Sequence, residues 1–212
     1  MPPGHADPNT EYIQVFTSKT SFNVNRHVLA TLSVAVIAAP ALAADDQAAM
    51  QGFVDDTIMA FAQAPELIAA VTAQNKITAG YDQARIDALD TSWQAEIGAA
   101  DQPTIAPVLG NAASDFLRAQ VEDAKGAITE IFVMDAVGLN VASSGITSDY
   151  WQGDEAKFQE TYPSGVGAVH FGDIEFDEST NSYQAQISLT LADPTSGEAI
   201  GAMTVGVNAE AF

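Results

Sequence analysis

A change of hydrophobic period near Ala127 constrains the fold of this chain more than any other feature. Before this point apolar residues recur at intervals of three or four, as on one face of a helix, for example at Met50, Val54 and Ile58. After it they alternate or run continuously, as in Ile128 to Asp135, which is typical of a strand. Helices followed by strands predict an α+β domain, with the helices on one face of an antiparallel sheet.

The same patterns place the individual elements along the chain. We expect a helical part over 46–125, with apolar stripes over 50–61, 65–76, 86–97 and 116–121. We expect five strands in the sheet-rich part 127–208, over 128–135, 139–143, 166–176, 183–191 and 199–207. A short helix from Asp154, acting as its N-cap, to Tyr162 is expected between the second and third strands.

The N-terminal 43 residues read as an extension followed by a signal peptide, in front of the domain. The stretch Val28 to Ala43 is apolar and uncharged, follows Arg26, and ends in the small-residue pattern of a signal-peptide cleavage site. Retention as a membrane anchor is the alternative, but the run is shorter than the roughly 20 residues that span a bilayer. We therefore expect cleavage near Ala43, a single exported domain over 44–212, and a periplasmic or secreted location.

Charge and cysteine content exclude several classes of protein. With 28 acidic against 7 basic residues and a net charge of −21, the chain lacks the basic surface that nucleic-acid phosphates require. The absence of cysteine excludes disulfides and thiolate zinc sites. The acidity is explained either by adaptation of the surface to salt, or by a basic partner or cationic ligand.

Motifs of catalysis are missing from the sequence. There is no G-x-S-x-G elbow, H-E-x-x-H zinc motif or phosphate-binding loop, and one histidine, His170, remains after the expected cleavage. A lone histidine cannot build a histidine-rich metal site. It also leaves no second histidine that could serve as the base of a serine triad. We expect a protein that is not an enzyme and that has no cofactor and no metal.

Two segments resemble the PDC/Cache family of extracellular sensor domains. In the run from Ile131 to Phe158, a D-x-x-G-x-x-V-A hairpin precedes the segment SDYWQGDE, as in that family. The closing run from Leu191 to Asn208 is similar to the family's final hairpin. With the leading helices, the resemblance covers nearly all of residues 44–212.

The resemblance implies a fold and a role. It implies a PAS-like five-stranded antiparallel sheet with a long N-terminal helical region packed on one face. The other face would hold a small-molecule pocket, roofed by the segment after the second strand. It also implies a role in signal transduction, here through a separate membrane-bound signalling partner because no signalling domain follows in this sequence.

The segment after the second predicted strand carries most of the candidate ligand-binding residues. Aromatic and charged side chains gather within ten residues there, and such side chains can line a pocket and place a few polar groups in it. The candidates are Asp149, Tyr150, Trp151, Asp154 and Lys157, together with His170 in the third strand. The alternatives are that Trp151 packs the loop, that Lys157 forms a surface ion pair, and that His170 is a hydrogen-bonded sheet histidine.

Two functions remain open on this evidence. The first is an exported sensor-type domain that binds a small metabolite, an amine, amino acid or carboxylate, without chemistry. The alternative is an interaction protein with a PAS-like sheet and no functional pocket, forming a homodimer through its N-terminal helices. The fourth strand bears on the choice, because its polar set from Gln184 to Thr190 faces either solvent or a pocket.

Overall fold

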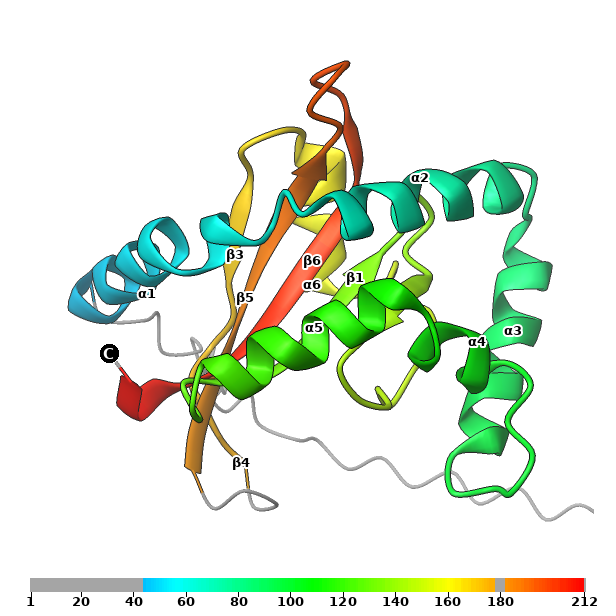
Figure 1. Ribbon diagram of the computed structural model, residues 1–212, viewed down its shortest axis with the longest axis horizontal. Coiled ribbons are helices and arrows are strands. Elements are labelled where there is room, and N and C mark those ends of the chain that lie inside the picture. Colours follow the sequence, from blue (N-terminus) through cyan, green and yellow to red (C-terminus); the bar gives the residue numbers. More distant parts are fainter. Residues whose placement is uncertain (1–43, 178–181, 212) are drawn as a thin grey trace, which may run out of the picture. The chain divides into compact units, whose positions relative to one another are not determined.

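The computed structural model divides the chain into two units, Met1–Ala39 and Pro40–Phe212. It describes residues 44–177 and 182–211, which belong to the second unit (Figure 1). The predicted signal segment and its cleavage site near Ala43 lie outside the described residues. Within the described part of the chain, no helix is long and apolar enough to cross a membrane.

The helical part contains five α-helices and one 3-10 turn among the described residues: α1 (Ala44–Asp56), η1 (Ile58–Ala60), α2 (Pro65–Thr78), α3 (Gln83–Glu96), α4 (Ile105–Leu109) and α5 (Ala112–Asp123). Their N-termini follow from local chemistry. Pro65 occupies the first position of α2, where the missing N–H costs nothing. Asp82 accepts a hydrogen bond from the Arg85 N–H and so caps α3, and Asn111 caps α5 in the same way.

The strands form one antiparallel sheet. They are β1 (Ile128–Met134), β2 (Asn140–Ser143), β3 (Val169–Phe171), β4 (Glu175–Asp177), β5 (Ser182–Ala192) and β6 (Ala199–Asn208). The order is β2-β1-β6-β5-β3, and β4 also pairs with β5. The predicted α+β class with a PAS-like sheet is therefore confirmed, and the chain closes with the 3-10 turn η3 (Ala209–Ala211).

The third predicted strand, 166–176, is wrong in one respect, because it is two short strands. Pairing with β5 runs to Phe171 opposite Ile187 and resumes at Glu175 opposite Gln184. Three residues on this side thus face two on β5, so one residue is extra, as in a β-bulge. The Gly172 N–H still donates to the Gln186 carbonyl, at 2.8 Å, before the chain leaves the ladder.

The connection from β2 to β3 carries a shorter helix than expected. Here α6 covers Ala156–Gln159 and a 3-10 turn, η2, covers Tyr162–Ser164. The predicted N-cap at Asp154 is wrong, because Glu155 is the N-cap residue and its side chain makes no capping hydrogen bond. The Thr161 hydroxyl donates to the Lys157 carbonyl at 2.7 Å, so it satisfies a carbonyl of α6 beside the point where the helix ends.

The main core lies between the helices and one face of the sheet. Figure 1 shows α2 and α5 crossing in front of this face, α1 beside the sheet next to β3, and α6 behind the sheet. Apolar residues of the helices, including Met50, Leu67 and Leu117, pack against the sheet residues Ile131, Val133, Ile187, Leu189 and Val205. A second core joins α3 and α4 to the β1–β2 hairpin through Trp93, Ile105, Leu139 and Tyr150. The helical region thus covers one face, as predicted.

Candidate ligand-binding site

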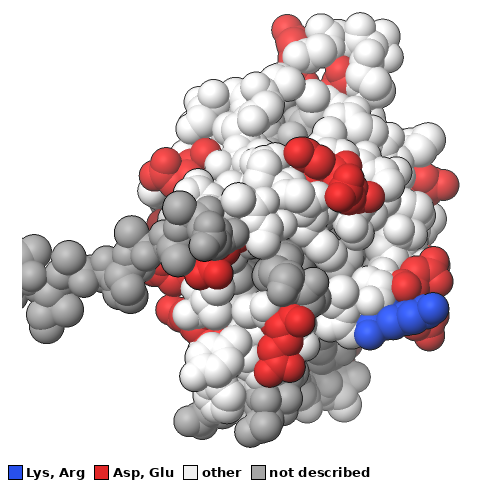
Figure 2. Space-filling view, turned by 90° about the vertical axis from the view of Figure 1, so that its left-hand side faces the viewer, with Lys and Arg blue, Asp and Glu red and all other residues white. Residues whose placement is uncertain are grey.

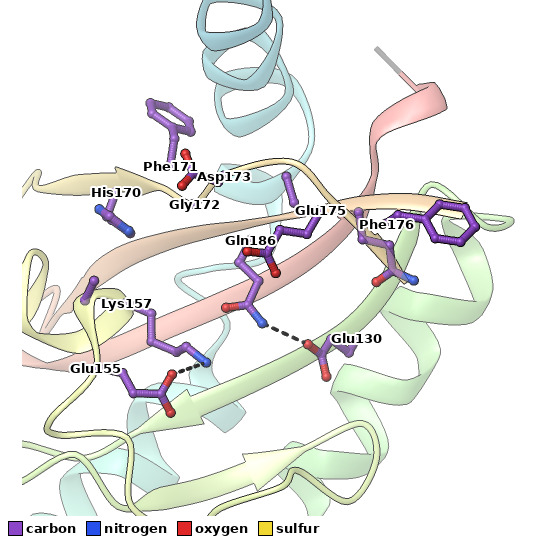
Figure 3. Close-up of a pocket in the computed structure, with 13 residues that line it drawn as sticks. Glu130, Glu155, Lys157, His170, Phe171, Gly172, Asp173, Glu175, Phe176 and Gln186 are labelled. Atoms are coloured by element: carbon purple, nitrogen blue, oxygen red, sulfur yellow. Dashed lines mark hydrogen bonds and ion pairs between the residues drawn. The ribbon is translucent and has the colours of Figure 1, made fainter. Parts of the chain in front are cut away.

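A cavity of about 680 Å³ opens on the face of the sheet opposite the main core. Its floor comes from β1 and β5, its outer wall from β3 and β4, and its roof from the start of α6 (Figure 3). The polar and charged residues that line it are Glu130, Glu155, Lys157, His170, Asp173, Glu175, Gln184 and Gln186. Binding pockets for small molecules commonly have volumes in this range, about 300–1,000 Å³.

The polar floor follows from the alternation of β5. Ala185, Ile187 and Leu189 point into the main core, so the intervening side chains must point to the other face. Of these, Gln184 and Gln186 line the cavity. The first two residues of the polar set of this strand therefore face a cavity and form part of its floor.

Hydrogen bonds between side chains of β1 and β5 fix the floor across the intervening strand β6. Gln186 Nε2 donates to Glu130 Oε1 at 3.3 Å, and Thr129 Oγ1 donates to Gln184 Oε1 at 3.0 Å. Farther along the sheet, the Ser188 and Thr204 hydroxyls lie 3.0 Å apart and are buried. The floor is thus a set of amides and one carboxylate held by their own contacts, which lowers the ordering cost of binding a polar ligand.

The rest of this face is filled by side chains. Phe132, Met134 and Ala202 from the sheet pack with Phe158 of α6. The rings of Phe158 and Tyr162 stack with centroids 5.4 Å apart. The cavity is consequently confined to the end of the sheet near Glu130, and its roof is anchored by an apolar cluster rather than lying loose.

Lys157 contributes the positive charge of the roof. Its Nζ lies 2.9 Å from Glu155 Oε2 and 5.4 Å from the centre of the Phe132 ring. Lys157 therefore forms the ion pair that was the predicted alternative to ligand binding, and this pair lies at the edge of the cavity. Carboxylates outnumber cations among the lining residues, since Glu130, Glu155, Asp173 and Glu175 stand against Lys157, so the lining is net negative.

His170 lies in β3 and also lines the cavity, with its side chain half-buried. Figure 3 draws it on the same side of the sheet as Lys157. The structure thus brings together two of the six predicted binding residues, Lys157 and His170. Their part in binding stays a prediction.

The other predicted residues lie elsewhere. The Tyr150 ring is buried against α3, and Trp151 Nε1 donates to the Val137 carbonyl at 2.8 Å, which packs the indole on the hairpin. Asp149 accepts hydrogen bonds from Ser148 and from Gln94. Asp154 is exposed and does not line the cavity.

Sequence reasoning did not select Glu130, Glu175, Gln184 or Gln186 as site residues. The signal for two of them was the alternation of the fourth predicted strand, which separated Gln184 and Gln186 from the apolar set. Glu130 stood out as a charge inside an otherwise apolar strand. Both features indicate a site once the strand order is known, because β1 and β5 each pair with β6, which lies between them.

Acidic groups are widespread outside the cavity as well. On the face shown in Figure 2, acidic side chains are spread among uncharged ones and basic side chains are scarce. Over residues 44–177 and 182–211, no group of three or more histidine or carboxylate side chains is placed to hold a metal ion.

Comparisons with known proteins find sensor domains among solved structures. The sensor domain of the V. cholerae histidine kinase DctB is 13% identical, with a TM-score of 0.40, over 77% of this chain and 54% of that chain. The ligand-binding domain of the Campylobacter jejuni chemoreceptor Tlp3, in complex with 4-methylisoleucine, is 12% identical, with a TM-score of 0.35, over 80% of this chain and 62% of that one.

A third similar structure is the ligand-binding domain of the Pseudomonas aeruginosa PAO1 amino-acid chemoreceptor PctC, in complex with GABA. It is 13% identical, with a TM-score of 0.35, over 67% of this chain and 58% of that chain. This chain therefore spans 54% to 62% of the length of these three domains. They are PDC/Cache-type sensor domains, the kind that the sequence motifs resemble. No protein-family model and no curated protein matches the sequence.

Proposed function

We propose that this protein is an exported, sensor-type domain that binds a small metabolite in the cavity floored by Glu130, Gln184 and Gln186. The observation that carries the proposal is this polar row, placed by strand alternation at the floor of a cavity of about 680 Å³. Amides and carboxylates held on two strands can fix the orientation of a polar ligand, while the cavity removes it from bulk water. Binding proceeds without chemistry.

The charges around the cavity favour a ligand that carries a positive group. Four carboxylate side chains line the cavity, those of Glu130, Glu155, Asp173 and Glu175, and the cation among the lining residues is Lys157, which lies 2.9 Å from Glu155. An ammonium or guanidinium group would be attracted to this cavity, whereas a ligand with carboxylates alone would be repelled. We therefore place amines and amino acids ahead of simple carboxylates.

Export and signalling complete the proposal. The chain would be cleaved near Ala43 and act in the periplasm or outside the cell, where it would report ligand binding to a separate membrane-bound signalling protein. Lys157 and His170 would contact the ligand from the roof and the outer wall, since both line the cavity. Dimerisation of the domain belongs to the same proposal.

A calorimetric and thermal-shift titration of the purified protein tests this function. The panel contains diamines, cationic and neutral amino acids, dicarboxylates and purines, because a ligand that binds only the native state raises the melting temperature. We expect a saturable shift with an amine or amino acid, weakened about tenfold or more by Glu130→Gln, which removes a charged acceptor. The matched control is Glu198→Gln, an exposed glutamate in the β5–β6 turn that does not line the cavity.

Two outcomes would contradict the proposal. The first is a ligand that binds equally well to the wild type and to Glu130→Gln. The second is no shift across the panel together with a melting temperature that rises with protein concentration. That second result would favour the alternative, a self-associating interaction protein.

A further inference from the structure

Gly206 of β6 lies in the floor of the cavity, between two of the residues that line it. It pairs with Glu130 on β1 and with Gln186 on β5, so the three residues form one row across three strands. Paired residues of an antiparallel sheet point to the same face, and Glu130 and Gln186 both line the cavity. The neighbours Val205 and Val207 point into the main core. The floor therefore contains a position without a side chain, midway between a carboxylate and an amide.

Side-chain atoms of β1 occupy the space above Gly206. A Cβ at this position would lie 2.6 Å from Glu130 Cγ, 2.8 Å from Thr129 Oγ1 and 3.3 Å from Glu130 Oε1. Glycine inside a strand often marks a close approach of this kind. Glu130 thus lies across β6, and on the far side its Oε1 accepts a hydrogen bond from Gln186 Nε2 at 3.3 Å (Figure 3).

A bulge in β1 brings a second polar side chain to the same crossing. The register of β1 against β6 shifts between Ile128 and Glu130, so Thr129 is an extra residue on β1. A bulge changes the direction of the side chains that it carries. Thr129 Oγ1 donates to Gln184 Oε1 at 3.0 Å, which is also on β5. Thr129 and Glu130 therefore both reach past Gly206, each to a different amide of β5.

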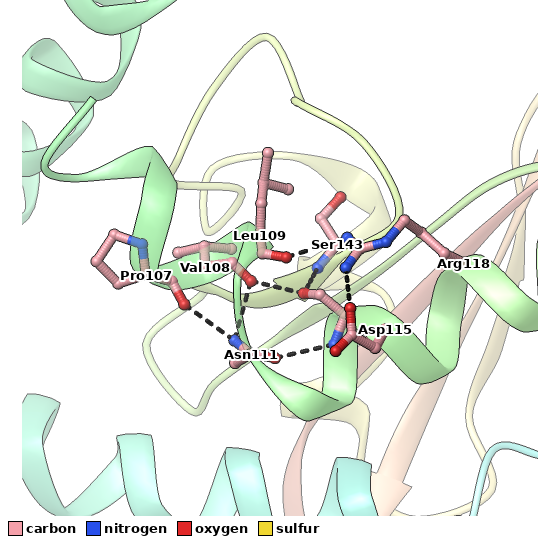
Figure 4. A network of polar contacts seen from close by, with 8 residues as sticks. Pro107, Val108, Leu109, Asn111, Asp115, Arg118 and Ser143 are labelled. Carbon is pink, nitrogen blue, oxygen red and sulfur yellow. Dashed lines mark hydrogen bonds and ion pairs between the residues drawn. The ribbon is translucent and has the colours of Figure 1, made fainter. Parts of the chain in front are cut away.

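The strand on the other side of β1 ends before the bulge. Pairing of β1 with β2 stops at Phe132 opposite Ser143. The Ser143 N–H donates to Ser114 Oγ at 2.9 Å, and the Ser114 hydroxyl donates to the Val108 carbonyl at 2.6 Å, which ties this end of β2 to α4 and α5 (Figure 4). The bulge consequently lies beyond the ladder between β1 and β2, where β2 does not constrain its backbone.

The phenyl rings of the described residues that line the cavity belong to the opposite face of the sheet. Phe171 packs against the main core. Phe176 pairs with Tyr183, and the two rings meet edge to face with their centroids 5.2 Å apart. Tyr183 and Gln184 are successive residues of β5, so the ring pair and the floor lie on opposite faces. Quaternary ammonium ligands are typically held by aromatic faces, and the phenyl rings in the described lining do not form such a cage.

The floor is better suited to a cation that carries N–H donors. Glu130 is half-buried and lines the cavity, so a bound molecule can reach its carboxylate. Hydrogen bonds from an ammonium or guanidinium group to a carboxylate are roughly twice as strong as those between neutral groups. A fully methylated ammonium has the same charge but no N–H, so it cannot form these bonds.

We propose that Gly206 is the residue that positions Glu130 in the floor of the cavity, and that this floor selects primary ammonium or guanidinium groups over quaternary ammonium. The inference rests on the proposed function, because it concerns the ligand of the same cavity. A side chain at position 206 would lift Glu130 off β6 and away from Gln186. The atoms that a Cβ would meet belong to the side chains of Glu130 and Thr129 and not to the backbone, so the sheet can keep its pairing.

The first measurement needs no ligand. Gly206→Ala is compared with Gly80→Ala, its matched control, because a Cβ at Gly80 would meet no atom within 4 Å. In NMR spectra, the side-chain amide signals of Gln186 should shift in Gly206→Ala toward their positions in Glu130→Ala. They should stay unchanged in Gly80→Ala, and melting curves check that each variant is folded. Unchanged Gln186 signals in Gly206→Ala would overturn the proposal, since residue 206 would not place Glu130.

The second measurement is isothermal titration calorimetry of the full-length protein. The probe is cadaverine, and its matched control is the fully N-methylated derivative, which has the same carbon chain and charge. The wild type should bind cadaverine at least about tenfold more tightly than the methylated form. Gly206→Ala should weaken cadaverine binding at least about fivefold and reduce that preference to less than about threefold. Gly80→Ala should change neither value.

Three results of the titration would overturn the proposal. Two concern the wild type: equal binding of the two probes, and no saturable binding of cadaverine up to millimolar concentration. The third is a loss of affinity in Gly206→Ala that is equal for both probes, because residue 206 would then control space and not the placement of Glu130. The proposed function is judged separately. A saturable shift with another member of its panel, weakened by Glu130→Gln, would uphold binding in this cavity where the present inference fails.

Discussion

The rings of Trp93 and Tyr150 stack with their centroids 5.1 Å apart and their planes inclined by 5°. Both side chains are buried, and Trp93 Nε1 donates to the Thr147 carbonyl at 2.9 Å. The stack thereby fastens α3 to the segment that follows β2. That segment leads to the roof of the cavity floored by Glu130, Gln184 and Gln186.

We predict that this stack contributes to stability beyond the burial of its two rings. Trp93→Leu and Tyr150→Leu should each lower the free energy of unfolding by about 1–3 kcal/mol. The double variant should lose less than the sum by about 0.5–1.5 kcal/mol, the usual coupling of an aromatic pair. Urea unfolding followed by circular dichroism measures all four proteins, and strict additivity would contradict the coupling.

Asp90 provides a second link between α3 and the same segment. Its Oδ1 accepts hydrogen bonds from the backbone N–H groups of Tyr150 at 2.8 Å and Trp151 at 3.0 Å. We predict that Asp90→Ala leaves both donors without this partner and lowers the free energy of unfolding by about 1–3 kcal/mol. Hydrogen exchange of these two amides should accelerate more than that of the sheet.

The matched control for Asp90 is Asp87, on the same helix. Asp87 Oδ1 accepts from Gln83 Nε2, and Asp90 Oδ2 accepts from Gln94 Nε2, so each alanine variant loses one such contact. Asp87→Ala should therefore leave the exchange of the Tyr150 and Trp151 amides unchanged. If both variants accelerate it equally, the loss of helix contacts and not the long-range link explains the effect.

Gly138, in the β1–β2 turn, is required by both backbone conformation and space. Its φ is +85°, and a Cβ there would lie 2.6 Å from the Gly153 Cα. We predict that Gly138→Ala destabilises the protein by at least about 1 kcal/mol more than Gly98→Ala does. Gly98 has a φ of +75° but open space around a Cβ, so it isolates the conformational cost. Equal losses in thermal or urea unfolding would show that the close approach relaxes freely.

The raised pKa of Asp135 predicts that the stability of the protein depends on pH. Burial raises the pKa of this carboxyl, although hydrogen bonds from Leu139, Thr78 and Val137 act in the opposite direction. Because the folded-state pKa is raised, the unfolded chain ionises first as the pH increases. The stability that this group contributes is full below the ordinary aspartate pKa of about 4 and is lost as the pH rises toward the folded-state value.

The measurement compares the wild type with Asp135→Asn, which does not titrate at this position. The variant should be less stable, because an amide cannot accept with both atoms from Thr78 and from the turn N–H groups. The difference in unfolding free energy between the two proteins should be larger at pH 4 than at pH 7. A difference that grows with pH would reverse the sign and contradict the raised pKa.

Much of the fold was predictable because it depends on periodic burial. The stripes of Met50, Val54 and Ile58 and the alternation of β5 each follow from one face meeting the core. The break between β3 and β4 was not predictable from pattern alone. It depends on one extra residue opposite β5, which becomes visible when the register is known.

The candidate site was predictable only in part, because the direction of side chains in an irregular segment depends on distant residues. Tyr150 and Trp151 are drawn toward α3 and the hairpin by Asp90 and Val137, which are 60 and 14 residues away. Lys157 and His170 lie on regular elements and do line the cavity floored by Glu130, Gln184 and Gln186. Composition indicated which residue types could bind a ligand. Tertiary contacts decide which of these residues face the cavity and which pack elsewhere.

The divided outer strand has a consequence for how the protein behaves in concentrated solution. β5 is an eleven-residue strand, but its outer side is covered by two three-residue strands with a bulged connection between them. An incoming strand from another molecule would meet a short and interrupted row of backbone donors and acceptors instead of a continuous one. Short, irregular edges of this kind resist strand-by-strand growth into aggregates, so this edge protects a sheet whose interior is built from strongly β-forming sequence.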